Sequence, residues 1–336
     1  MWKGREVRIV DGSTVKMPGT AEMLAEYPQE SQQRPGVGFP LARILVVFSL
    51  AVGAVVEMAI GPYQGKGTGE TSMFRRLLHR FSVGDVILAD RYFSGWFDMV
   101  LCGANRLDLV VRMNESRKAD FRKGTWLGKD DHIIRIKRPS RPQWMSVEDY
   151  SECPKEIELR EVRIRVHQKG FRTKTIIVHT TLLDAEQYTK EDIGKIFRQR
   201  WNAELNLRSL KTTMHMEYLR CKTPHRIRNE FYINLVAYNL IRRAIALAAI
   251  QADTKPWHVS FKGAIQTLNN FLAILTTPIE AMQWCLQLLY AIAAHEVGKR
   301  PDRVEPRAVK LRPKMYARLS KPRAQYERLG KRPTNC

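Results

Sequence analysis

The chain has 336 residues, of which 44% are apolar, so it can bury a sizeable core in two or three modules or in one domain with a large insertion. This composition excludes a chain that is disordered throughout. Fifty-six Lys and Arg residues against thirty-four Asp and Glu residues give a formal net charge of +22. Such a surplus favours a polyanionic partner, most often nucleic acid. A ribosome-associated protein, a membrane-surface protein or a charge that serves only solubility are the alternatives.

The five cysteines are scattered, and neither they nor the eight histidines form a cluster typical of zinc or of a disulfide framework. We therefore expect a reducing, cytosolic compartment. The first ten residues are charged and alternating, unlike a signal peptide. The apolar run 44–56 has thirteen residues, too few to cross a bilayer of about 30 Å as a helix. Gly53 in its middle favours two buried strands that meet at a turn, and no membrane partner is expected.

The N-terminal third alternates short strands with helices. A strand is predicted over 5–11, with Val7, Ile9 and Asp11 on one face, and a turn-rich stretch follows to residue 40. A hairpin is predicted over 43–50 and 55–60. Beyond the hairpin, the pattern predicts a helix over 70–81, a strand buried on both faces over 85–90, a helix over 94–104 and a strand over 108–113.

The middle of the chain changes character. Short alternating runs among charged residues, Gly and Pro predict an antiparallel β segment within 114–183. Thr189 is a candidate cap for a long helix to about Thr213, and further helices are predicted over 227–251, 260–275 and 278–297. The stretch 299–336 holds thirteen Lys or Arg and five Pro residues, which predicts an extended basic tail that is ordered mainly on a phosphate backbone.

Two acidic residues are placed as ligands for hard cations would be. Phosphodiester chemistry often uses two Mg²⁺ ions about 4 Å apart, held by converging carboxylates. Asp11 ends one predicted strand and is followed by Gly12, which relaxes the backbone as the chain leaves the sheet, and Asp90 ends another. Each has a plainer interpretation, because an Asp before Gly is typical of a turn and an Asp after a strand is typical of a helix cap.

The predicted helix from Thr189 carries a row of functional side chains along one border. Spaced three, four and seven residues apart, they fall within an arc of roughly 60° at about 100° per residue, and they are Phe197, Arg200, Glu204 and Lys211. The alternative is a solvated face on which Arg200, Glu204 and Arg208 form i,i+4 ion pairs.

Three blocks in this order resemble a known family. They are DGST at Asp11, LADRYF at Asp90, and FRQRW-x₂-E-x₆-K across 197–211. They resemble the catalytic blocks of DDE-class insertion-sequence transposases, above all the "insertion sequence four" family, whose helix signature is Tyr, Arg, Glu and Lys at these spacings. The PGVGFP turn at 35–40, the GxGxGE stretch ending at Glu70 and the basic PRAVKLRPKMYARL segment also match, so the resemblance spans essentially the whole chain.

The resemblance implies an α/β fold with a ribonuclease-H-like core, a mixed sheet with flanking helices. Its first part would be 1–113, interrupted by a β-rich insertion at 114–183 and completed by a helix in 184–222, before a helical region at 223–298 and a basic tail at 299–336. The first and fourth strands of that fold are neighbours, so Asp11 and Asp90 would converge and Glu204 would approach from the helix.

The resemblance also implies the chemistry. The three carboxylates would hold two Mg²⁺ ions, for which Mn²⁺ can substitute, and would support DNA cleavage and strand transfer without a covalent enzyme intermediate. The residues implied at the DNA phosphates are Arg200, Lys211, Arg208, Phe197 and Arg91. The expected partners are double-stranded DNA of the transposon ends and the target, with a homodimer in the DNA complex, in a bacterial cytoplasm beside the nucleoid.

The chain departs from the family pattern in two places. Phe197 replaces the usual Tyr, which removes a phosphate-contacting hydroxyl. The first catalytic Asp comes at position 11, where relatives carry a helical, end-recognising domain before it, so we expect a truncated gene, a wrongly assigned start or a fragment that binds DNA with little preference for transposon ends. The competing hypotheses are a non-catalytic DNA-binding remnant and a general ribonuclease-H-like nuclease.

Two tryptophans lie in the predicted β-rich segment. Family enzymes use an aromatic ring there to hold a flipped base, which is a physically sensible stacking interaction. For Trp126 and Trp144 we expect instead the commoner role of a buried core side chain.

Overall fold

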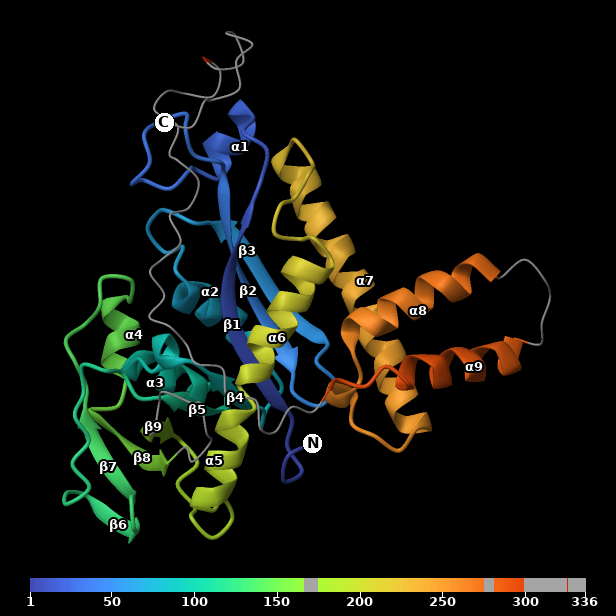
Figure 1. The fold of residues 1–336 in the computed structure, drawn as a ribbon. Helices are drawn as coiled ribbons and strands as arrows, with labels where there is room; N and C mark the ends of the chain where they lie inside the picture. The colour runs from blue at the N-terminus through green and yellow to red at the C-terminus, as the bar shows by residue number, and fades with distance from the viewer. Residues whose placement is uncertain (166–174, 275–280, 299–324, 326–336) are drawn as a thin grey trace, which may run out of the picture.

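A nine-stranded mixed sheet organises the protein in the computed structural model, which describes residues 1–165, 175–274 and 281–298 together with Gln325. The predicted basic tail thus lies almost entirely outside the described residues. The strand order is β3-β2-β1-β4-β5-β9-β8-β7-β6 (Figure 1). The strands are β1 (Val7–Lys16), β2 (Leu41–Ser49), β3 (Val55–Pro62), β4 (Val86–Ala89), β5 (Asp108–Arg112), β6 (Thr125–Gly128), β7 (Asp131–Lys137), β8 (Glu156–Arg165) and β9 (Thr175–Thr180).

The first five strands combine parallel and antiparallel pairing. β1 lies between β2, which runs antiparallel to it, and β4, which runs parallel. β5 continues the parallel pairing beside β4. The predicted hairpin is confirmed, since β2 pairs antiparallel with β3 and the turn between them holds Gly53 at a φ of 72°. That φ is in the left-handed region, which favours glycine.

Strand β1 is longer than the sequence pattern predicts. It continues past Asp11 to Lys16, because the segment from Gly12 onward pairs with β2 in a regular antiparallel register. Gly12 therefore does not release the chain from the sheet, and the prediction that Asp11 ends the strand is wrong. Asp11 lies in mid-strand, where the backbone is held by ladders rather than by a turn.

Strands β6 to β9 extend the same sheet beyond β5. The antiparallel pairing predicted for this segment is confirmed, and β9 joins it to the N-terminal strands through β5. A buried ion pair ties β7 to β8, with Arg160 donating from Nε to Asp131 at 2.8 Å and from Nη2 at 2.5 Å. Arg160 also donates to the carbonyl of Tyr188, so the pair links the sheet to the loop that enters the next helix.

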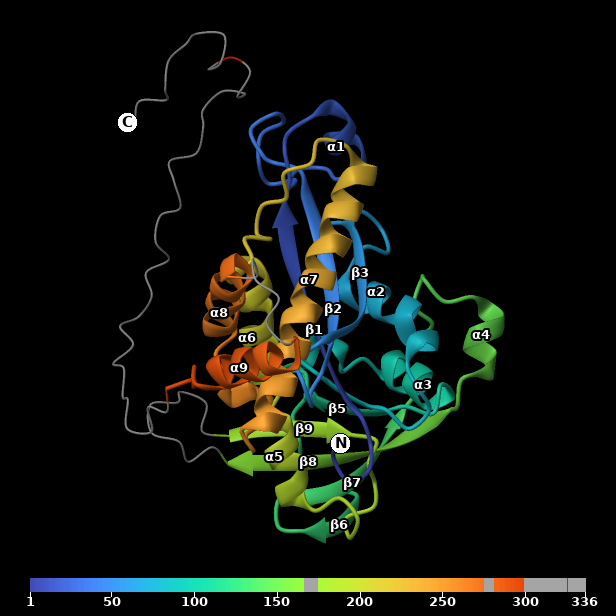
Figure 2. The ribbon, with the colours of Figure 1, turned by 90° about the vertical axis from the view of Figure 1, so that its right-hand side faces the viewer.

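Helices cover both faces of the sheet (Figure 2). One face packs against α2 (Glu70–Leu77) and α3 (Trp96–Ala104), with the small helix α4 (Val147–Glu152) nearby, and the other packs against α5 (Lys190–Arg198), α6 (Trp201–Arg208) and α7 (Pro224–Gln251). Alternation along β1 divides its side chains between two cores: Ile9 faces α5 to α7, and Val10 faces α2 and α3. The remaining helices are α1 (Ala21–Glu26), α8 (Phe261–Ile274) and α9 (Ala281–Ala293).

The long helix predicted after Thr189 is interrupted. Thr189 does cap α5, through a capping box with Asp192. The N–H groups of Gln199 and Arg200 then bond three residues back, which tightens the backbone and separates α5 from α6. After α6 the chain widens into a π-helical turn, Ser209–Thr213. The prediction of one continuous helix is therefore wrong, although the predicted span is helical almost throughout.

The helices predicted after residue 223 are confirmed as α7, α8 and α9, within the residues that the structure describes. α7 lies along the sheet and also contacts α8 and α9. By length and composition alone α7 could cross a membrane, a test that core helices of soluble proteins also pass.

The pair between Arg160 and Asp131 gives a test of how β7 and β8 are held. Replacing Asp131 with Ala leaves a fully buried guanidinium without its counter-charge, so we expect a loss of about 3–5 kcal/mol in the free energy of unfolding. Urea unfolding measures it. The control is Glu158→Ala, which breaks an exposed pair with Arg135 on the same two strands and should barely move the midpoint. Equal effects in both variants would contradict this account.

Candidate active site

Asp11 and Asp90 lie on neighbouring strands at the same level. The parallel register pairs Ile9 of β1 with Leu88 of β4. Asp11 and Asp90 each lie two residues beyond this pair, Asp90 just past the end of β4, and Asp90 is near enough to affect the pKa of Asp11. Alternation places both on the face that carries Ile9 and Leu88, which is the face covered by α5 to α7.

The charge on Asp11 is held in an unfavourable environment. Burial raises the pKa of Asp11 from 3.8 to about 6, the Arg200 guanidinium and the Gly12 N–H oppose that rise, and the charges on Asp90 and Glu204 add to it. Asp11 Oδ1 accepts a hydrogen bond from Gly12 N at 2.9 Å. Arg200, Asp90 and Glu204 are therefore near enough to Asp11 to influence its pKa.

Asp90 is fixed by its own backbone. It follows the last residue of β4 and its Oδ1 accepts a hydrogen bond from Tyr92 N at 2.8 Å, capping a short 3-10 helix (Arg91–Phe93). The plainer interpretation of Asp90 as a cap is therefore true. It does not exclude a second role, because one carboxylate oxygen satisfies the cap and Oδ2 remains for another ligand.

Glu204 reaches the site from α6 and is paired with Arg200. The Arg200 guanidinium donates to Glu204 Oε1 at 3.0 Å, as the i,i+4 spacing predicts. Both side chains are partly exposed, so the pair is free to rearrange at little cost.

The carboxylate oxygens are suitable ligands for a divalent cation, but the side chains do not converge on one point. Within the described part of the chain, no three His, Cys, Asp or Glu side chains converge closely enough to hold a metal ion. The donors are nevertheless hard oxygens, and the pKa of Asp11 is raised first by burial and then by the charges of Asp90 and Glu204. Such a set fits Mg²⁺, which prefers carboxylates and keeps several waters.

Lys211 contacts β1 directly. Its Nζ lies 3.2 Å from the Oγ of Ser13, two residues beyond Asp11 on the same face of the strand. Lys211 thus joins the π-helical turn to the strand that carries Asp11.

Phe197 does not belong to this polar row. It is 5% exposed and packs in the core between α5 and the sheet. The backbone break after α5 separates its direction from that of Glu204, so the arc drawn on one ideal helix does not apply. Buried in this way, the Phe197 ring packs the helix and is not placed to contact DNA.

Two other predicted phosphate contacts lie away from the carboxylates. Arg91 forms an ion pair with Glu115 in the loop after β5. Arg208 is exposed and lines a separate pocket between α6, α7 and α8. Neither arginine contacts Asp11, Asp90 or Glu204 in the described structure.

Glu70 is a fourth acid near the site that the sequence indicates only as the end of a glycine-rich stretch. It starts α2 on the opposite face of the sheet, directly behind Gly12, where a Cβ atom would lie 2.2 Å from the Glu70 carboxyl carbon. Arg43 of β2 donates to Glu70 Oε1 at 3.1 Å. Burial raises the pKa of Glu70, Arg43 opposes the rise and the charge of Asp90 adds to it. Glycine at position 12 is therefore required for close packing rather than for a turn.

The two tryptophans are not core side chains, so that expectation is wrong. Trp126 on β6 is 73% exposed. Trp144 is 47% exposed and lies under the Arg75 guanidinium, 3.8 Å from its ring centre. Trp126 lies on the edge strand of the sheet, and Trp144 lies in the loop between β7 and α4.

Comparison with known proteins gives the family. The transposase DDE domain family matches residues 2–240, which include all three acids. The transposase InsG for insertion sequence element IS4 of Escherichia coli (strain K12) is 24% identical over 328 residues, which are 94% of this chain and 70% of that protein. The chain therefore belongs to the DDE insertion-sequence transposases.

A solved structure is also similar to this chain. A cryo-EM structure of piggyBac transposase in a synaptic complex with hairpin DNA aligns with a TM-score of 0.44 and 9% sequence identity. The alignment covers 85% of this chain, which spans 57% of the length of that one.

The cost of ionising the buried Asp11 can be tested by measuring the free energy of unfolding. Folding raises the pKa of Asp11, so the ionised form destabilises the native state above about pH 6, whereas below pH 3.8 both states are protonated and the effect vanishes. At pH 7.5 without metal, Asp11→Asn should raise the free energy of unfolding by roughly 1–3 kcal/mol. Urea unfolding at pH 7.5 and at pH 4 gives the comparison. A variant that is less stable at pH 7.5 would contradict the electrostatic account.

Proposed function

We propose that this chain is a DNA transposase that cleaves phosphodiester bonds and joins the freed strand to a target. The observation that carries the proposal is that Asp90, directly after β4, and Glu204, on α6, both lie near enough to Asp11 on the neighbouring strand β1 to raise its pKa. The family supports the reaction class. The strand order 3-2-1-4-5 with α5 and α6 on one face supports a ribonuclease-H-like core, interrupted by an insertion over 114–183.

In this proposal Asp11, Asp90 and Glu204 hold two Mg²⁺ ions, with Mn²⁺ as a substitute. The metal supplies activation of the attacking oxygen and stabilisation of the leaving oxygen. Asp11 must be ionised to bind a metal ion, and with a pKa of about 6 it is largely ionised at neutral pH. Asp90 offers the oxygen that its backbone cap does not use. Glu204 becomes available when Arg200 turns away.

Arg200 and Lys211 are proposed to bind the phosphates next to the cut. Arg200 exchanges Glu204 for a phosphate oxygen, which keeps a charge-assisted hydrogen bond for the guanidinium. Lys211 exchanges the neutral Ser13 hydroxyl for a charged acceptor. One movement of Arg200 thus frees a metal ligand and binds substrate, which couples DNA entry to assembly of the carboxylate site.

The proposed partners are double-stranded DNA at the element ends and at the target, with two copies of the chain in the complex. The charge of +22 supports binding to DNA in the bacterial nucleoid. The alternative is a remnant that binds DNA without cutting it, and the match to the transposase family does not favour it.

Metal binding can be measured without any DNA. Mg²⁺ at millimolar concentration should raise the melting temperature of the wild type at pH 7.5, because a ligand that binds only the folded state stabilises it. The rise should shrink at pH 5, where Asp11 is protonated, and be lost in Asp11→Asn. Glu148→Gln, an exposed acid on α4, is the control and should keep the rise. An unchanged rise in Asp11→Asn would place the metal elsewhere.

A second pair of variants should affect DNA cleavage and DNA binding differently. Asp90→Asn keeps the cap to Tyr92 but removes the charge, so we expect Mg²⁺-dependent strand cleavage to fall by at least about a thousandfold with DNA binding unchanged or tighter. Lys211→Gln should weaken binding and lower the salt slope by about one phosphate. Cleavage and gel-shift assays on linear DNA measure both. Equal loss of binding in the two variants would mean that Asp90 is structural.

A further inference from the structure

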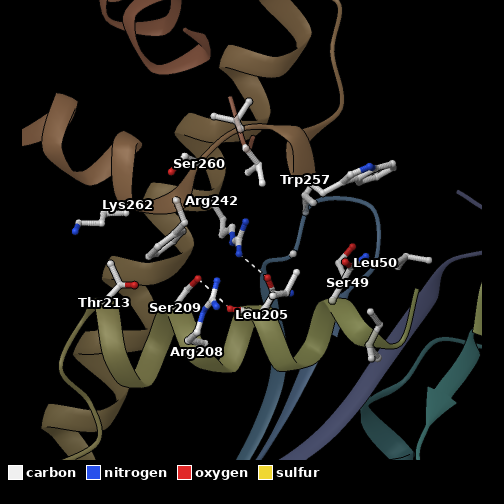
Figure 3. A pocket seen from close by; sticks show the side chains of 18 of the residues that line it. Ser49, Leu50, Leu205, Arg208, Ser209, Thr213, Arg242, Trp257, Ser260 and Lys262 are labelled. Carbon is white, nitrogen blue, oxygen red and sulfur yellow. Dashed lines mark hydrogen bonds between the residues drawn. The ribbon is translucent and has the colours of Figure 1, made fainter. Parts of the chain in front are cut away.

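A second pocket of about 440 Å³ lies between α6 and the C-terminal helices. Figure 3 shows α6 along its floor, with Arg242 of α7 above and Lys262 of α8 at its rim. Leu205, Asn206 and Arg208 line it from α6, and Ser209 lines it from the π-helical turn that follows. At about 100° per residue, Leu205 and Asn206 point roughly 100° and 160° away from Glu204. Arg208, one turn further on, points only about 40° away, so the pocket extends from the far side of the helix to the side next to Glu204.

A buried positive charge without a counter-ion faces this pocket. Arg242 is 7% exposed, and no carboxylate among the described residues forms an ion pair with it. Its Nε donates to Tyr238 Oη at 2.8 Å and its Nη2 to Asn206 Oδ1 at 2.5 Å. Both acceptors are neutral, and no hydrogen bond from Nη1 is seen among the described residues. The guanidinium also lies over the Tyr238 and Phe261 rings, 5.2 and 4.9 Å from their centres, and neither ring carries a full negative charge. Burying an arginine is costly unless an anion pairs with it.

The start of α8 adds further donors. Ser260 precedes the helix and lines the pocket with Phe261 and Lys262. The first N–H groups of a helix have no acceptor inside it and carry the positive end of the helix dipole. The Ser260 hydroxyl accepts from Gly263 N at 3.2 Å, which leaves its own proton for an acceptor in the pocket.

The charge around the pocket is strongly one-sided. Arg208 and Lys262 join Arg242 in the lining, against Glu296 as the one acid among the described lining residues. Arg208 lies on α6 below the Arg242 guanidinium (Figure 3). A helix N-terminus together with convergent arginine, lysine and hydroxyl groups is the combination that binds phosphate.

We propose that this pocket binds a phosphate group and that a DNA strand supplies it. The assignment of this phosphate to DNA rests on the proposed function, whereas the presence of a phosphate site does not. Trp257, 43% exposed at the side of the pocket, offers a ring on which the attached sugar or base can stack. A strand bound here contacts α6 through Arg208, one helical turn beyond Glu204.

The phosphate site is tested first with inorganic phosphate and the full chain. At constant ionic strength and without Mg²⁺, 20 mM phosphate, on the order of a hundred times a submillimolar Kd, should raise the melting temperature of the wild type by several degrees. The double variant R208Q/K262Q replaces two exposed side chains and should lose the rise. Arg243→Gln, an exposed arginine on α7 outside the pocket, should keep it. No rise in the wild type, or an equal rise in R208Q/K262Q, would overturn the site.

The DNA source is tested by the salt dependence of binding in the same variants. R208Q/K262Q should reduce the slope of log K against log salt by about one to two phosphates, whereas Arg243→Gln should change it less. Phosphate binding with an unchanged slope would show a site for free phosphate and overturn the DNA assignment. Loss of cleavage in Asp90→Asn is independent of this site, so a failure here leaves the proposed function standing.

Discussion

The parallel pairing of β1 with β4 is the constraint on which the candidate site depends. Because both strands run in the same direction with a fixed register, Asp11 and Asp90 come level, and alternation turns them to one face. Every other functional group is placed relative to that pair: Glu204 and Arg200 from α6, and Lys211 through Ser13. A slip of one residue in the register would turn one acid to the opposite face.

In this arrangement the ionised Asp11 destabilises the folded state. Asp11 is buried beside two other acids with one arginine to oppose them, which is why its pKa rises to about 6. The surrounding ladder of β2 and β4 supplies the stability that tolerates it. Sites with uncompensated charge of this kind are typical of functional centres, since a bound cation or substrate relieves the cost. Arg242 is a buried positive charge without an ion pair among the described residues, and a bound anion would offset the cost of burying it.

The sequence predicted the secondary structure well where periodicity alone decides it. The β2–β3 hairpin and the common face of Ile9 and Asp11 follow from alternation, and the cap at Thr189 follows from its capping box. Other features depend on contacts between distant segments. The extension of β1 past Asp11 needs the pairing with β2, and the space at Gly12 is taken by Glu70 from a helix nearly sixty residues later.

The interruption between α5 and α6 was equally hidden, because no Pro or Gly marks the point where the backbone tightens at Gln199 and Arg200. The central claim is that Asp11, Asp90 and Glu204 share a metal site. Crystals soaked in Mn²⁺ and measured at the manganese absorption edge test it most directly. The account predicts anomalous peaks between Asp11 and Asp90, with Glu204 released from Arg200. Peaks elsewhere, or Glu204 still paired with Arg200 beside a bound ion, would contradict it.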